Sequence, residues 1–226
     1  MPNHETEWSL QKRLTRSWLE HEPVVLDGVQ LFLAAWEVMT DFRINDPRRH
    51  WSSPSIDFVF LDSAGCMVLA ELKNEIRTPR ESWSVVCQVT HRAHELAAGY
   101  SRARLESAYV DCHSGVDGRV PDSSVPTDLL RAHAATFNRP ALSQLPGYPA
   151  RRVIMAKDFG PAFASVLSAA NSQSRDQLVA ALGRYKPRGE IKRYLHLRFD
   201  ESLVAAEPIR AVTVDGFPWT SAADET

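Results

Sequence analysis

The chain has 226 residues, of which 44% are hydrophobic, and its formal net charge is −2 at neutral pH. This length suits a single domain, or one domain with a modest extension, and the apolar fraction suits a globular core. The slightly negative charge excludes a globally basic nucleic-acid-binding protein, although a local basic groove beside an acidic site is compatible with it.

Residues 5–20 predict an amphipathic helix at the start of the chain. Leu10, Leu14 and Trp18 recur at four-residue spacing and form one apolar stripe. Glu7 lies in the first turn, where an acidic side chain also favours the helix dipole. An apolar segment follows the helix, and we expect a strand there.

Residues 55–73 predict a β-hairpin in which two apolar runs flank a short loop. Gly65 suits the left-handed position that ends a three-residue hairpin loop, and Asp62 suits the start of the turn. If the loop is 63–65, Asp62 lies opposite Cys66, and the register of the whole hairpin is set.

This register brings three charged side chains together. Asp57 lies opposite Glu71, and Lys73 is two residues further along the second strand, so all three share one face of the sheet. Charges inside an apolar hairpin are costly unless they are paired, hydrated or bound to a metal. The hairpin is therefore the candidate functional site of the chain.

The arrangement of Asp57, Glu71 and Lys73 resembles the active site of the PD-(D/E)XK nuclease superfamily, with an Asp at a strand start and a Glu-X-Lys on the next strand. The resemblance implies a restriction-endonuclease-like α/β core, in which helices flank a central mixed β-sheet. It also implies that Asp57 and Glu71 hold Mg²⁺ or Mn²⁺, since hard cations prefer oxygen ligands. Lys73 would position the attacking water or neutralise charge at phosphorus.

A Glu-X-Lys triplet alone is weak evidence, and the chain contains a second copy at 190–192 with Asp176 upstream. Asp176 belongs to a segment with helical spacing that Gly183 ends, so this copy has no hairpin to align its charges. Only the context of the first copy favours a nuclease site. The structural alternative for the first copy is a buried ion pair or a degenerate site on a nuclease-like scaffold.

The start of the chain extends the resemblance. Glu7-x-x-Leu10-x-x-x-Leu14 before the first strand looks like the opening of the archaeal and actinobacterial branched-DNA and mismatch endonucleases. It implies that Glu7 is a third acid at the metal site, with Glu20 as a weaker alternative; otherwise Glu7 is a solvated residue on the helix face. Those endonucleases carry a separate DNA-binding domain. Here a homodimer, a protein partner or the insertion at 112–150 would supply DNA targeting.

Residues 83–98 predict a further helix beyond a polar connection. Many members of the superfamily carry a Gln on this helix that points at the metal site, and Gln88 matches that position. It would bond a phosphate or a metal-bound water; the alternative is an ordinary polar helix position. Arg92, where some members have Tyr, is a candidate phosphate ligand, with a solvated cation as the alternative.

The most basic segment of the chain is 184–194. Its candidate nucleic-acid contacts are Arg184, Lys186, Arg188, Lys192 and Arg193, with two tyrosines that could stack a base. A solvated loop before a strand explains the composition equally well. A weaker basic candidate, 43–51, precedes the hairpin.

The rest of the chain suits a continuing α/β domain. Residues 112–150 are rich in Gly, Pro and Ser, which predicts a loop-rich insertion with a short helix near 127–135. We expect a weak strand or helix end at 107–111, strands at 152–156, 193–199 and 209–214, and helices at 159–170 and 175–182. Residues 1–219 would form one nuclease-like domain with its core motifs in 5–100, followed by a polar tail at 220–226.

The three cysteines, Cys66, Cys87 and Cys112, form no disulfide framework and lack metal-ligand spacing. His91 and His94 share a helix but have no further ligand at zinc spacing. There is no signal peptide and no apolar run long enough to span a bilayer, so we expect a cytoplasmic protein without a membrane partner.

Together these features predict a metal-dependent deoxyribonuclease in DNA repair, restriction or mobile-element defence. The alternative from another class is a catalytically idle nuclease-fold module that binds nucleic acid or a protein partner, and a nuclease acting on RNA is a third option. Retention of all three charges favours the enzyme, because an idle charged cluster is unfavourable without its metal. The modest net charge favours the module.

Overall fold

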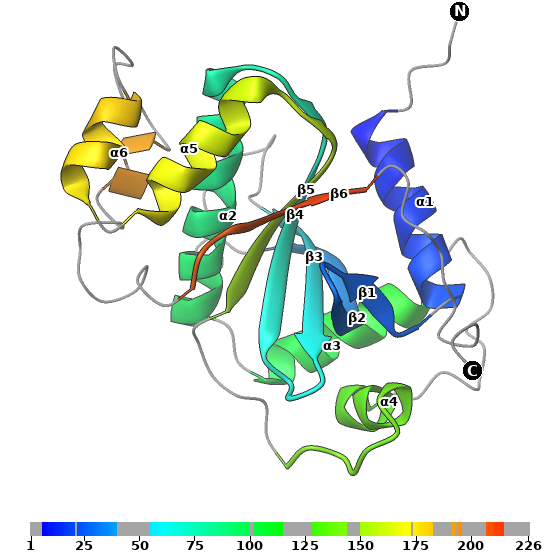
Figure 1. Cartoon of the computed structure of the whole chain (residues 1–226). Coiled ribbons are helices and arrows are strands. Elements are labelled where there is room, and N and C mark those ends of the chain that lie inside the picture. The colour runs from blue at the N-terminus through cyan, green and yellow to red at the C-terminus, as the bar shows by residue number, and fades with distance from the viewer. Residues whose placement is uncertain are drawn as a thin grey trace, which may run out of the picture.

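The computed structural model describes residues 6–20, 22–39, 55–99, 102–114, 128–143, 150–172, 174–182, 191–192, 194–195 and 207–214. Over these ranges the chain forms a six-stranded mixed sheet flanked by helices (Figure 1), which confirms the α/β class expected from the sequence. No helix within the described ranges combines the length and hydrophobicity needed to cross a membrane.

The strands follow their chain order across the sheet. They are β1 (Val24–Leu26), β2 (Val29–Met39), β3 (Ser55–Asp62), β4 (Met67–Ile76), β5 (Arg151–Phe159) and β6 (Arg210–Thr213). Neighbours pair antiparallel from β1 to β4 and parallel from β4 to β6. The change from antiparallel to parallel pairing follows from the connections. Helices carry the chain back to the end of the sheet where β4 begins, so β5 and β6 run in the same direction as β4.

The hairpin of β3 and β4 has the register that the sequence predicts. Leu61 pairs with Met67, and the Asp62 N–H donates to the Cys66 carbonyl at 3.0 Å. Gly65 adopts φ +81°, the left-handed conformation that only glycine enters at no steric cost. The Asp62 carboxylate also accepts from the backbone N–H of Cys66 at 2.9 Å, which fixes the loop.

One face of the sheet is covered by α1 (Glu7–Glu20), as Figure 1 shows. The predicted stripe of Leu10, Leu14 and Trp18 is buried there, with at most 2% of any of these residues exposed. The Trp18 ring meets Phe58 edge-on, with centroids 4.9 Å apart. This packing fixes where the first turn of α1 lies relative to β3 and β4.

The opposite face packs against helices that follow β4 and β5. They are α2 (Pro79–Gly99), α3 (Arg102–Ser114), α4 (Leu129–Thr136), α5 (Pro161–Asn171) and α6 (Arg175–Leu182). Each contributes buried apolar residues to the larger of the two cores. Asp128 caps α4 through the N–H groups of Leu130 and Arg131, so the short helix predicted in the insertion is confirmed.

One ambiguous element is resolved and one predicted element is wrong. The segment 107–111, expected as a weak strand or a helix end, is helical and lies inside α3. The strand expected at 193–199 is wrong for its described part, since Tyr194 and Leu195 are helical. Tyr194 is fully buried, and its hydroxyl donates to the Ala170 carbonyl at 3.1 Å. This anchoring to α5 outweighs the alternating pattern of the segment. The basic segment at 43–51 and the tail at 220–226 lie outside the described residues.

Candidate active site

Asp57, Glu71 and Lys73 lie at the end of the β3–β4 ladder. The last regular pair is Phe58 with Ala70, so the same register places Asp57 opposite Glu71. Instead of continuing the ladder, the Asp57 carboxylate accepts the Leu72 N–H at 2.6 Å. The regular pairing of the two strands therefore ends where the charged side chains gather.

The course of β3 changes at this end of the hairpin. Ile56 and Phe58 belong to opposite cores, although residues two apart in a regular strand share a face. In the adjacent β2, Glu37 has φ +51° and its carboxylate accepts from the Ser55 hydroxyl at 3.1 Å. Asp57 is therefore the residue at which β3 changes face.

Glu71 is the buried centre of the site, with 1% of its side chain exposed. One carboxylate oxygen, Oε2, contacts the Arg92 guanidinium, and the other, Oε1, lies 3.2 Å from the Lys73 Nζ. The approach of Lys73 is an ion pair without hydrogen-bond geometry, and Oε1 is a buried acceptor with no hydrogen-bond donor. Two cations thus balance one buried carboxylate, as burial of a charge requires.

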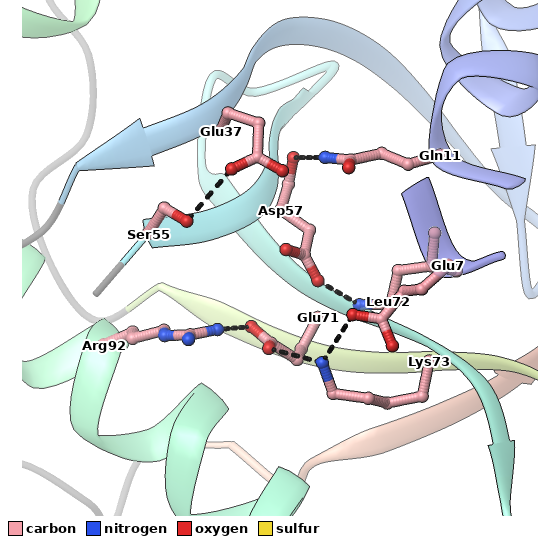
Figure 2. A network of polar contacts seen from close by, with 9 residues as sticks. All are labelled: Glu7, Gln11, Glu37, Ser55, Asp57, Glu71, Leu72, Lys73 and Arg92. Carbon is pink, nitrogen blue, oxygen red and sulfur yellow. Dashed lines mark hydrogen bonds and ion pairs between the residues drawn. The ribbon is translucent and has the colours of Figure 1, made fainter. Parts of the chain in front are cut away.

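Lys73 also connects the hairpin to α1. Its ammonium donates to Glu7 at 3.0 Å, so the acid predicted on the first helix does reach the site, though as the partner of a lysine (Figure 2). Glu20, the alternative acid, lies 13 residues further along α1, which is about 20 Å at 1.5 Å per residue. It is remote from the site.

Asp57 and Lys73 both have pKa values that differ from those of ordinary surface groups. Burial, followed by the nearby charge of Glu71, raises the pKa of Asp57 to about 8, against the opposing effects of Lys73, the Leu72 N–H and Arg92. Burial lowers the pKa of Lys73, but Glu71, Asp57 and Glu7 outweigh it, so the pKa of Lys73 is raised. At neutral pH Lys73 is charged, and burial favours the protonated form of Asp57.

Gln88 and Arg92 lie one turn apart on α2. Arg92 is held against Glu71 and is 16% exposed, so it forms part of the buried charge cluster rather than a solvated helix surface. The Gln88 side-chain oxygen is buried and has no hydrogen-bond partner. Both residues were expected near the site; the ion pair to Glu71 was not expected for Arg92.

Gln11 is a residue of the site that was not predicted from the sequence. Its side-chain amide donates to the Asp57 carbonyl at 3.4 Å, and only 5% of the residue is exposed. It lies one turn after Glu7, so a polar residue on the buried side of an amphipathic helix was the available clue. Of the predicted basic contacts, Lys192 is exposed. The others, Arg184, Lys186, Arg188 and Arg193, lie outside the described residues.

The metal-ligating capacity of the site rests on two carboxylates. Among the described residues, no three His, Cys, Asp or Glu side chains are arranged to hold a metal ion, and His91 and His94 on α2 belong to no such group. Asp57 and Glu71 nevertheless fit a hard cation, because Glu71 Oε1 lacks a hydrogen-bond donor and the two acids repel each other. A cation would relieve both costs.

Comparisons with known proteins add no relative. No protein-family model, no curated protein and no solved structure matches this chain significantly.

Proposed function

We propose that the protein is a metal-dependent nuclease that hydrolyses phosphodiester bonds in DNA, on a restriction-endonuclease-like fold. The observation that carries the proposal is the convergence of Asp57, Glu71 and Lys73 where the regular pairing of β3 and β4 ends. The order of elements agrees with it: a helix, an antiparallel hairpin, a helix on the opposite face and a parallel strand.

Asp57 and Glu71 would hold the metal, Mg²⁺ or Mn²⁺, with Glu7 as a candidate third acid. A bound divalent cation would polarise the phosphate and lower the pKa of a water molecule, so that hydroxide is available near neutral pH. Glu7 would have to exchange its bond with Lys73 for this role, which its 47% exposed side chain permits.

Among the described residues, Lys73 is the best placed to act on the reacting phosphate. The nearby charge of Glu71 outweighs the effect of burial and keeps the pKa of Lys73 raised, so it remains an ammonium at any physiological pH. A fixed positive charge stabilises the negative charge that develops on the phosphate oxygens, and its N–H groups orient a water. The free side-chain oxygen of Gln88 could accept a hydrogen bond from that water.

A second function has one observation in its favour. Both Glu71 oxygens already face cations, Arg92 and Lys73, and such a closed cluster is also what a structural ion network requires. This favours a catalytically idle nuclease-fold module that binds nucleic acid or a protein partner. The two functions differ in cleavage and in their response to metal.

Cleavage tests the proposal directly. Plasmid, linear, single-stranded and branched DNA, and an RNA strand, are incubated with Mg²⁺ or Mn²⁺ and the wild type, Lys73→Ala or Arg131→Ala. We expect metal-dependent cutting that Lys73→Ala lowers at least a hundredfold. Arg131, a cation on α4 whose side chain is 82% exposed, is the control and should leave the rate unchanged. Cutting of RNA alone would assign the enzyme to RNA.

Metal binding separates the enzyme from the module. A cation that binds only the folded state stabilises it by about 2.7 kcal/mol at a hundred times its Kd, which corresponds to a Tm increase of about 5 to 10 °C at this chain length. Asp57→Asn should abolish that increase and leave the protein folded. No Tm response and no cleavage from a folded wild type would contradict the nuclease and leave the module.

A further inference from the structure

The first turn of α1, which contacts the candidate active site through Glu7, also carries an exposed tryptophan. Trp8 is 55% exposed, whereas Trp18 on the same helix is buried. It follows Glu7, whose carboxylate bonds Lys73, and precedes Gln11, whose amide bonds the Asp57 carbonyl. Both bonds anchor this turn to the site, so Trp8 lies at its border.

A positive charge accompanies this aromatic ring. The Lys12 ammonium lies 4.8 Å from the centroid of the Trp8 ring, one helical turn further on. Lys12, Arg13 and Arg16 are all exposed on α1, so the surface beyond Trp8 is basic in a protein whose net charge is −2. An aromatic ring followed by exposed cations is the combination that binds a single nucleic-acid strand, because bases stack and phosphates pair with the cations.

We propose that Trp8 stacks on an unpaired base next to the cleaved phosphate and that Lys12 holds a neighbouring phosphate, so that the substrate is nucleic acid with unpaired bases at the cleaved bond. The inference rests on the proposed function, since it takes the site beside Trp8 to act on phosphodiesters. A duplex keeps its base faces covered, and only a strand, flap or frayed end can offer one to Trp8. The cations of α1 favour this polyanion over an apolar protein segment.

Binding without hydrolysis tests this inference separately from the nuclease activity. The affinity of the full chain for fluorescently labelled oligonucleotides is measured by anisotropy in EDTA, and again with Ca²⁺. We expect a single strand to bind more tightly than a duplex of the same length. Trp8→Ala should weaken single-strand binding about tenfold, whereas Trp8→Phe, which keeps a ring, should remain within about threefold of the wild type.

Two controls make the test specific. On a strand whose bases are replaced by abasic sites, Trp8→Ala should bind as the wild type does, because only stacking is removed. Lys12→Gln should reduce the slope of log affinity against log salt by about 0.7, the value for one phosphate of a single strand, and Arg131→Gln, an exposed cation on the distant α4, should not change it.

Equal binding of the wild type and Trp8→Ala to normal single strands would overturn the inference, as would an absence of binding to any strand. A change in self-association with Trp8→Ala, without a change in strand binding, would assign Trp8 to a contact between copies of the chain and overturn it too. The binding experiment requires no cleavage. Its outcome is therefore independent of the cleavage experiment with Lys73→Ala, and the two proposals can fail separately.

Discussion

At the scale of single residues, the site is organised around one buried carboxylate. Glu71 is neutralised by Lys73 from its own strand and by Arg92 from α2, while Asp57 nearby is pushed towards its protonated form. The cluster is therefore stable without a metal only because the cations are present. The charged residues that would serve catalysis therefore also contribute to the stability of the folded protein.

Arg92 provides the sharpest test of this dependence. Arg92→Met removes one of the two cations at a carboxylate that is 1% exposed, and we expect the free energy of unfolding to fall by about 3 kcal/mol. Urea denaturation measures it. Adding Glu71→Gln to Arg92→Met should restore most of the loss, because the buried charge is then absent. Equal stability of Arg92→Met and the wild type would show that Lys73 alone neutralises Glu71.

At the scale of elements, the hairpin loop sets the position of the site. Asp62 bonds the loop through the N–H groups of Ala64 and Cys66, and its carboxylate also pairs with Arg151 on β5 at 3.1 Å. A slip of one residue would move Glu71 to the opposite face of the sheet. The loop therefore determines whether the charges meet at all.

Gly65 makes that dependence testable. At φ +81°, any residue with a Cβ is strained, and we expect Gly65→Ala to lower the free energy of unfolding by about 1 to 2 kcal/mol. Gly65→Asn should lose less, because Asn tolerates the left-handed conformation. Chemical denaturation of both variants gives the comparison. If both variants lose the same free energy of unfolding, backbone strain at a positive φ is not the reason for glycine at this position.

The same hairpin explains how much of the fold the sequence predicts. Its register, α1 and its buried stripe, β5, α5 and α6 follow from local spacing and turn residues, and they agree with the structure. The helical conformation of Tyr194 does not follow, because it depends on burial against a distant helix. Local patterns decide an element unless packing partners far along the chain compete with them.

The candidate site divides in the same way. The juxtaposition of Asp57 and Glu71 follows from the hairpin alone, and the reach of Glu7 was expected from a resemblance. The pairing of Arg92 with Glu71 depends on the rotation of α2 about its axis, which the sequence leaves undetermined. The contact of Gln11 with the Asp57 carbonyl likewise depends on how α1 packs on the sheet, which the sequence leaves undetermined.

At the scale of the whole molecule, helices on both faces of the sheet contribute side chains to the site. Glu7 comes from α1 on one face and Arg92 from α2 on the other, and both reach the charges at the end of the hairpin (Figure 2). The layers of the fold are therefore linked by polar contacts there, in addition to their separate apolar cores. Changes at this point should affect the stability of the whole domain.

Away from the candidate site, a second largely buried acid links the end of α1 to α4. Glu22 follows α1, and its carboxylate accepts from the Thr136 hydroxyl of α4 at 3.4 Å, while Oε1 is buried without a hydrogen-bond partner. Burial raises the pKa of Glu22 to about 7, against the lowering effects of the Leu33 backbone and Thr136. A pH dependence of stability outside the candidate site follows from this raised pKa.

The unfolded chain binds a proton at Glu22 more weakly than the folded protein does, since the pKa rises from 4.5 to about 7 on folding. The stabilisation is therefore complete below pH 4.5 and is lost as the pH rises through 7. Glu22→Gln should remove this loss and become more stable than the wild type by up to about 3 kcal/mol between pH 5 and 9. Urea denaturation across that range, with the exposed Glu20→Gln as control, measures the difference. A difference between Glu22→Gln and the wild type that does not change with pH would show that burial leaves the charge on Glu22 undisturbed.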